Sequence, residues 1–230
     1  MSVDDQQKRR STPEPSLTRS ERVESTRSAL LDTAERLFAE RGIGAVSNRQ
    51  VSEAAGQGNN TAVGYHFGTK SDLLRAIVRR HQDDVENRRA VLVGDAGLSA
   101  DVRTWVDCLV RPTAEHLASL GPLTWYARLT AQLVADPSLR QVFTDEALSS
   151  TSLQDALAGI ERSRPDIPDF VRVQRDAMSR QLITYGFAER EEALAATRAD
   201  ACRQTWESFA TGLTDGITGM WLAPWTEPER

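Results

Sequence analysis

The sequence predicts an all-α protein with an N-terminal three-helix helix-turn-helix DNA-binding domain and a larger C-terminal helical domain. Three observations indicate this fold. Apolar residues recur at spacings of three and four along the chain after residue 20, and no alternating strand pattern is present. Two very short helical patterns between residues 47 and 68 are separated by a turn rich in Gly and Asn. The chain has 230 residues, 40% of them hydrophobic and 27% charged, which is enough for two packed domains.

The first helix is expected to begin between Ser20 and Glu24 and to end at Arg41. Residues 1–19 before it are polar and contain two prolines, so they are interpreted as a disordered N-terminal arm. The basic residues of this arm could touch DNA phosphates or the minor groove, but nearby acidic residues offset them and favour a solvated tail.

Residues 47–68 have the pattern of a helix-turn-helix. Ser47 and Gln50 have the spacing of a capping box, so a short helix should open there and end at a glycine. Turn residues follow, and the side-chain oxygen of Asn59 or Asn60 can cap a second short helix, which should end at Gly68. A tight turn between two such helices is the layout that sets the second one, the recognition helix, in the DNA major groove.

The remainder of the chain is expected to be helical. Thr69 and Asp72 form a second capping box, which opens a long helix from Lys70 to about Val91. The helices expected after it run from Ser99 to Leu120 with an interruption or kink at Pro112, from Leu123 to Ala135, from Asp136 as a short helix, from Thr151 to Arg162, from Phe170 to Ala196 and from Gln204 to Leu222.

Charge is distributed unevenly along the chain. The net charge is −5, but residues 1–80 hold 13 Lys and Arg against 10 Asp and Glu, a net +3, which leaves −8 for the rest. A basic N-terminal part can meet phosphate while the acidic remainder repels it, so one orientation on nucleic acid is favoured.

The sequence lacks the motifs of an enzyme. His66, His81 and His116 are dispersed among predicted helices, and no metalloprotease, α/β-hydrolase, P-loop or dithiol motif occurs, so neither catalysis nor a metal or cofactor is predicted. Cys108 and Cys202 are far apart, which indicates a reducing compartment. Neither a signal peptide nor an apolar run of transmembrane length is present, and the protein is expected to be cytoplasmic.

Four segments in order resemble the N-terminal domain of the TetR family of bacterial transcriptional regulators. They are L-F-A-E-R-G at the end of the first helix, V-S-E-A-A-G, Y-H-F and G-T-K-S-D-L-L, and the resemblance covers roughly residues 26–80. The segment A-G-Q-G-N-N-T-A-V-G-Y departs from the family pattern A-G-V-S-x-G-T-L-Y by one extra residue before Y-H-F. The resemblance implies a repressor released from its operator by a small molecule. The alternative is a DNA-binding regulator whose larger domain docks a protein partner.

The resemblance also implies how the chain is divided and where it contacts DNA. The expected parts are the arm (1–19), the DNA-binding domain (20–69) and a ligand-binding and dimerisation domain (70–230). DNA contacts are expected from Asn59, Asn60, Thr61, Gly64, Tyr65 and His66, and phosphate contacts from Asn48, Arg49 and Lys70. Asn can pair with adenine through two hydrogen bonds, and a glycine lets the helix approach the groove closely.

The expected partners are operator DNA, a second copy of the chain and a small amphipathic or aromatic ligand. Similar proteins dimerise through their last two helices, which here implicates Val173, Ala177, Gln181, Leu182, Tyr185, Phe209, Leu213, Ile217 and Met220. The same residues could instead face the chain's own core, and a wide apolar stripe can do both. The candidate ligand-pocket residues are Trp105, Leu109, His116, Trp125, Tyr126, Arg128, Leu129 and Phe143, although aromatic residues at helical spacing also form ordinary core.

Overall fold

A computed structural model describes residues 18–197 and 202–227 of the chain, and all regular structure within them is helical. The helices are α1 (Arg19–Arg41), α2 (Asn48–Ala54), α3 (Ala62–Phe67), α4 (Lys70–Ala96), α5 (Val102–Ser119), α6 (Tyr126–Ala135), α7 (Arg140–Leu148), α8 (Thr151–Ser163), α9 (Asp169–Thr197) and α10 (Cys202–Leu222). The predicted all-α fold is confirmed. Almost all of the predicted N-terminal arm lies outside the described residues.

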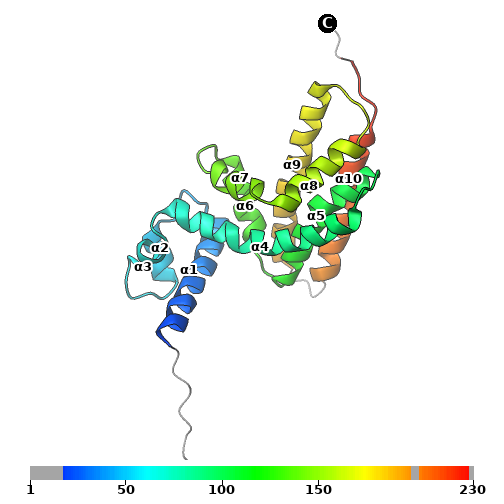
Figure 1. The fold of residues 1–230 in the computed structure, drawn as a ribbon. Coiled ribbons are helices and arrows are strands. Elements are labelled where there is room, and N and C mark those ends of the chain that lie inside the picture. Colours follow the sequence, from blue (N-terminus) through cyan, green and yellow to red (C-terminus); the bar gives the residue numbers. More distant parts are fainter. Residues whose placement is uncertain (1–17, 198–201, 228–230) are drawn as a thin grey trace, which may run out of the picture.

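The helices form a small group and a larger one, joined by α4 (Figure 1). Helices α1, α2 and α3 lie at one end of the molecule, and α4 runs from them into the larger group. There α10 packs along α5, α9 packs against α6, and α4 contacts α5, α7 and α8. No helix in the described part of the chain is both long and apolar enough to cross a membrane.

Three helices begin with capping boxes. The predicted boxes at Ser47 and Thr69 are confirmed, because each side chain accepts a hydrogen bond from the backbone three residues on, whose side chain bonds back. A third box, which the sequence reading missed, joins Thr18 and Glu21 and starts α1 at Arg19. Such caps satisfy backbone N–H groups that have no partner inside the helix.

The predicted cap of the recognition helix was wrong. Thr61 is the N-cap residue of α3 and makes no side-chain capping bond. The Asn59 side-chain oxygen instead accepts hydrogen bonds from the Thr61 backbone N–H (3.0 Å) and hydroxyl (2.6 Å). Asn59 therefore stabilises the turn itself, as asparagine does when it bonds to the backbone two residues on. The end of α3 was predicted correctly, at Gly68 with a φ of 88°.

Two later helix starts also differ from the prediction. The N-cap of α5 is Asp101 rather than Ser99. Helix α7 begins at Arg140 rather than directly after Asp136, because the Asp136 carboxylate accepts from the Ser138 backbone N–H (2.8 Å) and holds a turn there.

Helix α5 continues through Pro112 without the predicted interruption. A proline inside a helix lacks the N–H that would bond to the carbonyl four residues earlier, here that of Cys108. The buried Arg89 of α4 supplies a replacement donor, since its Nε lies 3.2 Å from the Cys108 oxygen. This tertiary contact satisfies the carbonyl group that the proline leaves free.

The described residues bury two apolar cores. One lies between α5, α8, α9 and α10 and includes Trp105, Phe187, Trp206 and Trp221. The other joins α1 to α4 with α6 and α7, through residues such as Phe38, Val63, Leu129 and Leu133. The small helix group therefore shares its core with two helices of the larger group.

Gln132 of α6 reinforces this connection. Its amide oxygen accepts from the Ile43 backbone N–H (3.0 Å), and its amide nitrogen donates to the carbonyls of Phe38 (3.0 Å) and Ala39 (3.3 Å). One side chain thus bonds to the last turn of α1 and the loop after it. Because those groups are a helix end without internal partners, the contact fixes α6 against α1.

Candidate nucleic-acid interface

The N-terminal end of α3 is held by α2. Val63 is fully buried, and its backbone N–H donates to the hydroxyl oxygen of the buried Ser52 (3.2 Å). The same hydroxyl donates to the Asn48 carbonyl (3.1 Å), so Ser52 joins α3 to the first turn of α2. The angle between the two short helices therefore depends on a buried hydroxyl as well as on apolar packing.

The C-terminal end of α3 is held by α1. The Arg27 guanidinium donates to the His66 carbonyl (3.1 Å) and lies over the Phe67 ring, 4.4 Å from its centre. A cation at a helix C-terminus meets carbonyl groups and the negative end of the helix dipole, and its contact with an aromatic face adds to this attraction. Helix α3 is thus anchored at both ends.

The outer surface of α3 and its turn is polar and open. Exposed residues are Asn59, Asn60, Thr61, Gly64 and Tyr65, all of them predicted to contact DNA. The Tyr65 side chain is 79% exposed, which is unusual for a large aromatic residue in a packed domain. His66 is half-buried, and its ring meets the Tyr65 ring edge-on at 5.0 Å. The structure brings the predicted residues to one surface, while their contact with bases remains a prediction.

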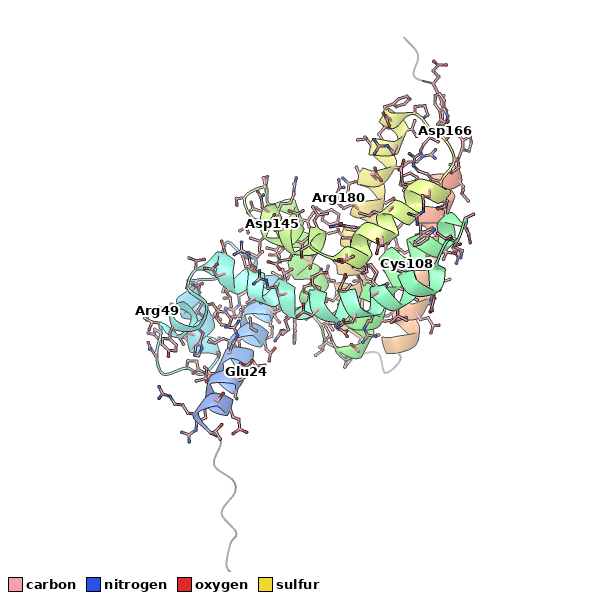
Figure 2. All side chains as sticks on the ribbon, viewed as in Figure 1. Glu24, Arg49, Cys108, Asp145, Asp166 and Arg180 are labelled. Atoms are coloured by element: carbon pink, nitrogen blue, oxygen red, sulfur yellow. The ribbon has the colours of Figure 1, made fainter. Side chains whose placement is uncertain are left out.

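The residues predicted to hold phosphates have different surroundings. Arg49 is exposed at the outer end of the small helix group (Figure 2) and pairs with Glu53 at 2.7 Å, which raises the pKa of Arg49. Asn48 is half-buried, and its side-chain oxygen has no hydrogen-bond partner.

Lys70 is bound to the protein itself, which the prediction did not anticipate. Its ammonium group donates to the carbonyls of Ile43 and Val46, the latter at 2.6 Å. Partial burial lowers the pKa of Lys70. Two of its three N–H donors therefore anchor the loop between α1 and α2, and one is left for a phosphate.

Sequence reasoning missed a basic hollow beside α3. It has a volume of about 520 Å³ and is lined by Arg27, His66, Phe67, Asp72, Arg75, Ala76 and Arg79. Arg75 and Arg79 also pair with Glu146 of α7, at 3.6 and 2.8 Å. The arginines come from two helices separated by more than 40 residues, so no local spacing in the sequence relates them.

The eight residues predicted to line a ligand pocket do not surround one cavity in this structure. Leu129 and Phe143 pack in the core that α6 and α7 share with α1 and α4. Trp105 and Leu109 pack in the other core, and Arg128 pairs with Glu191 of α9 at 3.0 Å.

The other three predicted pocket residues lie around α6. His116 and Tyr126 are buried against His81, and Trp125 is the half-buried N-cap residue of α6. The predicted grouping is therefore wrong, because most of these side chains serve the two cores or pair with neighbouring helices.

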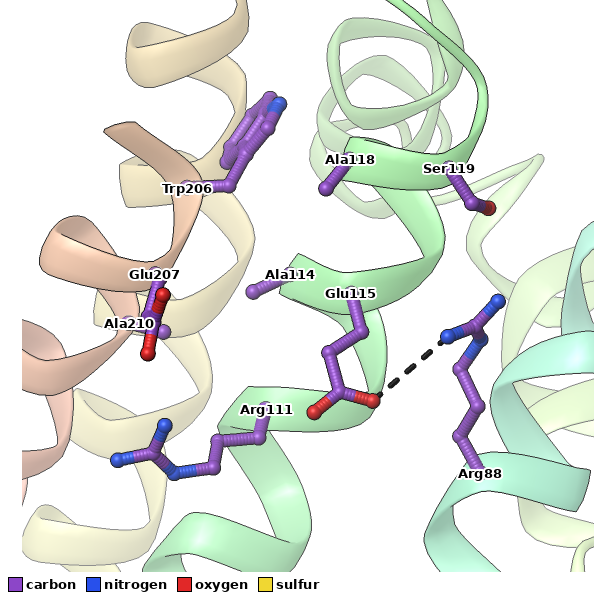
Figure 3. Close-up of a pocket in the computed structure, with 9 residues that line it drawn as sticks. All are labelled: Arg88, Arg111, Ala114, Glu115, Ala118, Ser119, Trp206, Glu207 and Ala210. Atoms are coloured by element: carbon purple, nitrogen blue, oxygen red, sulfur yellow. Dashed lines mark ion pairs between the residues drawn. The ribbon is translucent and has the colours of Figure 1, made fainter. Parts of the chain in front are cut away.

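A different hollow lies between α5 and α10 (Figure 3). It has a volume of about 350 Å³ and is lined by Arg88, Arg111, Ala114, Glu115, Ala118, Ser119, Trp206, Glu207 and Ala210. Arg88 and Glu115 form an ion pair across its rim at 3.6 Å. The indole N–H of Trp206 is buried without a hydrogen-bond partner. None of the eight predicted pocket residues lines this α5–α10 hollow.

The predicted dimer residues divide into two sets. On α9, Val173, Leu182 and Tyr185 are 57%, 45% and 41% exposed, Gln181 is exposed, and Ala177 is half-buried. On α10, Phe209, Leu213 and Met220 are half-buried. Ile217 is completely buried in the chain's own core, so the prediction that it meets a partner is corrected.

The two short helices, the turn between them and the exposed polar face of α3 define the small group as a helix-turn-helix domain. Residues 30–77 match the model of "Bacterial regulatory proteins, tetR family". The chain belongs to this family through that domain.

Further comparisons give one curated relative and several similar structures. The "HTH-type transcriptional repressor KstR2" of Rhodococcus jostii (strain RHA1) is 33% identical over 111 residues, 48% of this chain and 52% of that protein. The chain thus matches about half the length of this relative. The TetR-family regulator PfmR from Thermus thermophilus aligns at a TM-score of 0.48 and 17% identity, over 88% of this chain and 97% of that one. For GusR of Salmonella enterica the values are 0.48 and 19%, over 86% and 95%.

Proposed function

We propose that the protein is a sequence-specific DNA-binding transcriptional repressor that acts as a homodimer and is released from its operator by a small molecule. The observation that carries the DNA-binding part is the surface of α3. Its turn and helix expose two Asn side chains, Thr61, Gly64 and a Tyr65 that is 79% exposed, while both helix ends are anchored. A rigid helix with amide and hydroxyl groups facing outward suits reading base edges in the major groove.

The test of DNA binding starts from genomic fragments of the source organism. Fragments retained by the purified protein are sequenced, and binding to the enriched site is measured over a salt series. Asn60→Ala is expected to reduce the preference for the enriched site over random DNA by about 10- to 100-fold, equivalent to one lost base contact of about 1–3 kcal/mol. Asp155→Asn, at an exposed position on α8, is the matched control. Equal preference in wild type and Asn60→Ala would contradict the assigned surface.

The dimer is supported by two faces of the last helices. Helix α9 exposes Val173, Leu182 and Tyr185, and α10 exposes glycines at positions 212, 216 and 219 with open space around each. Exposed apolar side chains beside a helix face of glycines allow a second copy to pack closely. A dimer presents two copies of α3, and two linked modules bind far more tightly than one.

The dimer is tested by substituting two leucines of equal exposure. Leu182 on α9 is 45% exposed and Leu157 on α8 is 43% exposed. Leu182→Glu is expected to produce monomers in sedimentation at micromolar concentration and to abolish tight operator binding, because it buries a charge in the proposed interface. Leu157→Glu should remain dimeric. A monomeric wild-type chain would refute the proposal.

Ligand control is supported by the α5–α10 hollow and by α4. The hollow is within the size range of small-molecule sites, and its floor consists of three alanines beside Trp206. Arg88 of α4 lines it, while Lys70 at the other end of α4 binds the α1–α2 loop. A ligand releases DNA only if it prefers a conformation in which the two α3 helices are wrongly placed, and α4 connects the two ends.

A screen of amphipathic compounds tests this control, with thermal stabilisation and operator release measured together. A compound that acts through the hollow should lower operator affinity, and Ala118→Phe, which fills the hollow, should remove both effects. Ala158→Phe, at an exposed position on α8, is the control. Compounds that raise the melting temperature without changing operator affinity would contradict release by a ligand.

A further inference from the structure

A chain of four titratable side chains crosses the joint between the small and the larger helix groups. It runs from Glu35 of α1 through His81 of α4 and His116 of α5 to Asp84 of α4. Glu35 Oε2 lies 2.8 Å from His81 Nε2, His81 Nδ1 lies 2.7 Å from His116 Nε2, and His116 Nδ1 lies 2.7 Å from Asp84 Oδ2. Glu35 and both histidines are at most 5% exposed.

The number of protons in this chain follows from the hydrogen-bond geometry. The two outer contacts each need an N–H on the imidazole when the carboxylates are ionised, so Nε2 of His81 and Nδ1 of His116 both hold protons. Two neutral imidazoles would then have no proton left for the central contact. Their lone pairs would face each other at 2.7 Å without a hydrogen between them. The central contact therefore requires a third proton and one net positive charge on the pair.

Both carboxylates are ionised in these surroundings. Burial tends to raise the pKa of Glu35, but the hydrogen bond from His81 and the charges of His81 and Arg80 outweigh it and lower the pKa. Burial likewise opposes ionisation of Asp84, and hydrogen bonds from Arg88 and His116 lower its pKa. The third proton is thus left to the imidazoles.

The surroundings allow one charge on the pair but resist a second. Burial lowers the pKa of His116 despite its bond to Asp84, and charge on His81 lowers it further. The Tyr126 ring of α6 stacks on His81, with centres 4.0 Å apart, and excludes water from one face. The other charged groups around the chain are Asp32 of α1 (through Arg80), Arg80 and Arg88 of α4, and Glu115 of α5 (through Arg88).

We propose that the His81–His116 pair is a proton-binding site that joins α1 to α5, and that loss of its proton as the pH rises loosens this joint. With the proton bound, three short hydrogen bonds connect the two helix groups through α4. Without it, the central contact becomes repulsive and must open. The pair takes up and loses this proton as a unit, because the two rings are strongly coupled.

The effect on stability has a definite sign. In the unfolded chain a histidine has a pKa of about 6.5, while the folded pair retains its proton to higher pH. The stabilisation is therefore complete below about pH 6.5 and is lost as the pH rises through the pair's folded value. Over that range one extra bound proton makes the unfolding constant rise up to about tenfold per pH unit.

NMR of the full chain with ¹⁵N-labelled histidine tests the site directly. Near pH 6.5 the pair is expected to show three protonated nitrogens and one shared between the rings, and a single coupled transition at higher pH. Half-exposed His66 serves as the reference ring. Two imidazoles that stay neutral from pH 5 to 9, or that titrate independently, would overturn the proposal.

Unfolding experiments across pH provide a second, independent test. His116→Gln places an amide where Nε2 was, and this amide can donate to neutral His81 without an extra proton. The wild type should therefore lose stability relative to His116→Gln as pH rises from 6.5 to 8.5. Asp83→Asn, an exposed change on α4, should follow the wild type. Parallel curves for wild type and His116→Gln would reject the proton site.

The regulatory consequence rests on the proposed function. Operator affinity of the wild type is expected to change with pH over the same range, by at most about tenfold per unit for one proton, and His116→Gln should remove this change. Equal pH dependence in both proteins would show that the joint does not act on DNA binding. The NMR and unfolding tests need no DNA, so failure of the proposed function would leave them decisive.

Discussion

Replacing Gly159 of α8 by alanine is expected to destabilise the larger helix group. A Cβ atom at this position would lie 2.0 Å from Cδ2 of Trp105 and 2.2 and 2.5 Å from two further ring atoms. Carbon atoms in contact are ordinarily about 3.5–4.0 Å apart, so the ring or the helix must move by about 1.5 Å. Trp105 is 2% exposed, and its indole N–H donates to the Ser99 carbonyl at 2.9 Å, so the ring has little freedom to move.

The size of the effect follows from three contributions. Overpacking a buried site costs about 1–3 kcal/mol. Displacing Trp105 also weakens its hydrogen bond to Ser99, which is worth about 1 kcal/mol. Alanine in a helix is favoured over glycine by about 1 kcal/mol, which offsets part of this. The net loss is about 1–3 kcal/mol, and for a chain of this length it lowers the melting temperature by about 2–12 °C.

Calorimetry of matched variants checks this reasoning. Gly94 of α4 is exposed and has open space at its Cβ position, so Gly94→Ala should slightly stabilise the protein through helix propensity alone. In a Trp105→Leu background, Gly159→Ala should cost at least about 1 kcal/mol less, because the clashing ring is gone. A Gly159→Ala protein as stable as Gly94→Ala would refute the argument.

Three other changes have defined outcomes. Ser52→Ala leaves the buried Val63 N–H without its partner, so denaturant unfolding should show a loss of about 1–3 kcal/mol and operator binding should weaken for all sequences. Lys70→Ala should lower the slope of log affinity against log salt by about 0.9, as for one lost phosphate contact, and lower stability by freeing two carbonyls; an unchanged slope would leave only the loop-anchoring role. Burial raises the pKa of Cys108 to about 11, so in a Cys202→Ser chain it should resist alkylation at neutral pH unless unfolded, and stability should fall above about pH 8.5, where only the unfolded thiol ionises.

The sequence was sufficient wherever a structure depends on neighbours a few residues apart. The capping boxes at Ser47 and Thr69 were predicted because each bond closes over three residues, and the start of α4 followed from the second. The helical periodicity also located α9 and α10 to within about two residues at each end. The exposed face of α3 could be named because a two-turn helix between glycines has few ways to pack.

Only the tertiary structure decided contacts between distant segments. The buried Glu191 of α9 caps the start of α6 by accepting from the backbone of Ala127 (3.1 Å) and Arg128 (3.0 Å), more than 60 residues earlier. The indole of Trp105 occupies the space over Gly159, and no pattern in the sequence relates the two. The joint of two histidines and two carboxylates likewise draws on three helices.

The same limit explains the two corrected groups of residues. Ile217 has the helical spacing of an interface residue, but a stripe on one helix has the same pattern whether it faces its own core or a partner. The aromatic residues predicted around one ligand cavity were divided between two cores and the His81 cluster. Local hydrogen bonds and periodicity determine where helices begin and which side is apolar, whereas the choice of what that side meets is made by all the helices packing together.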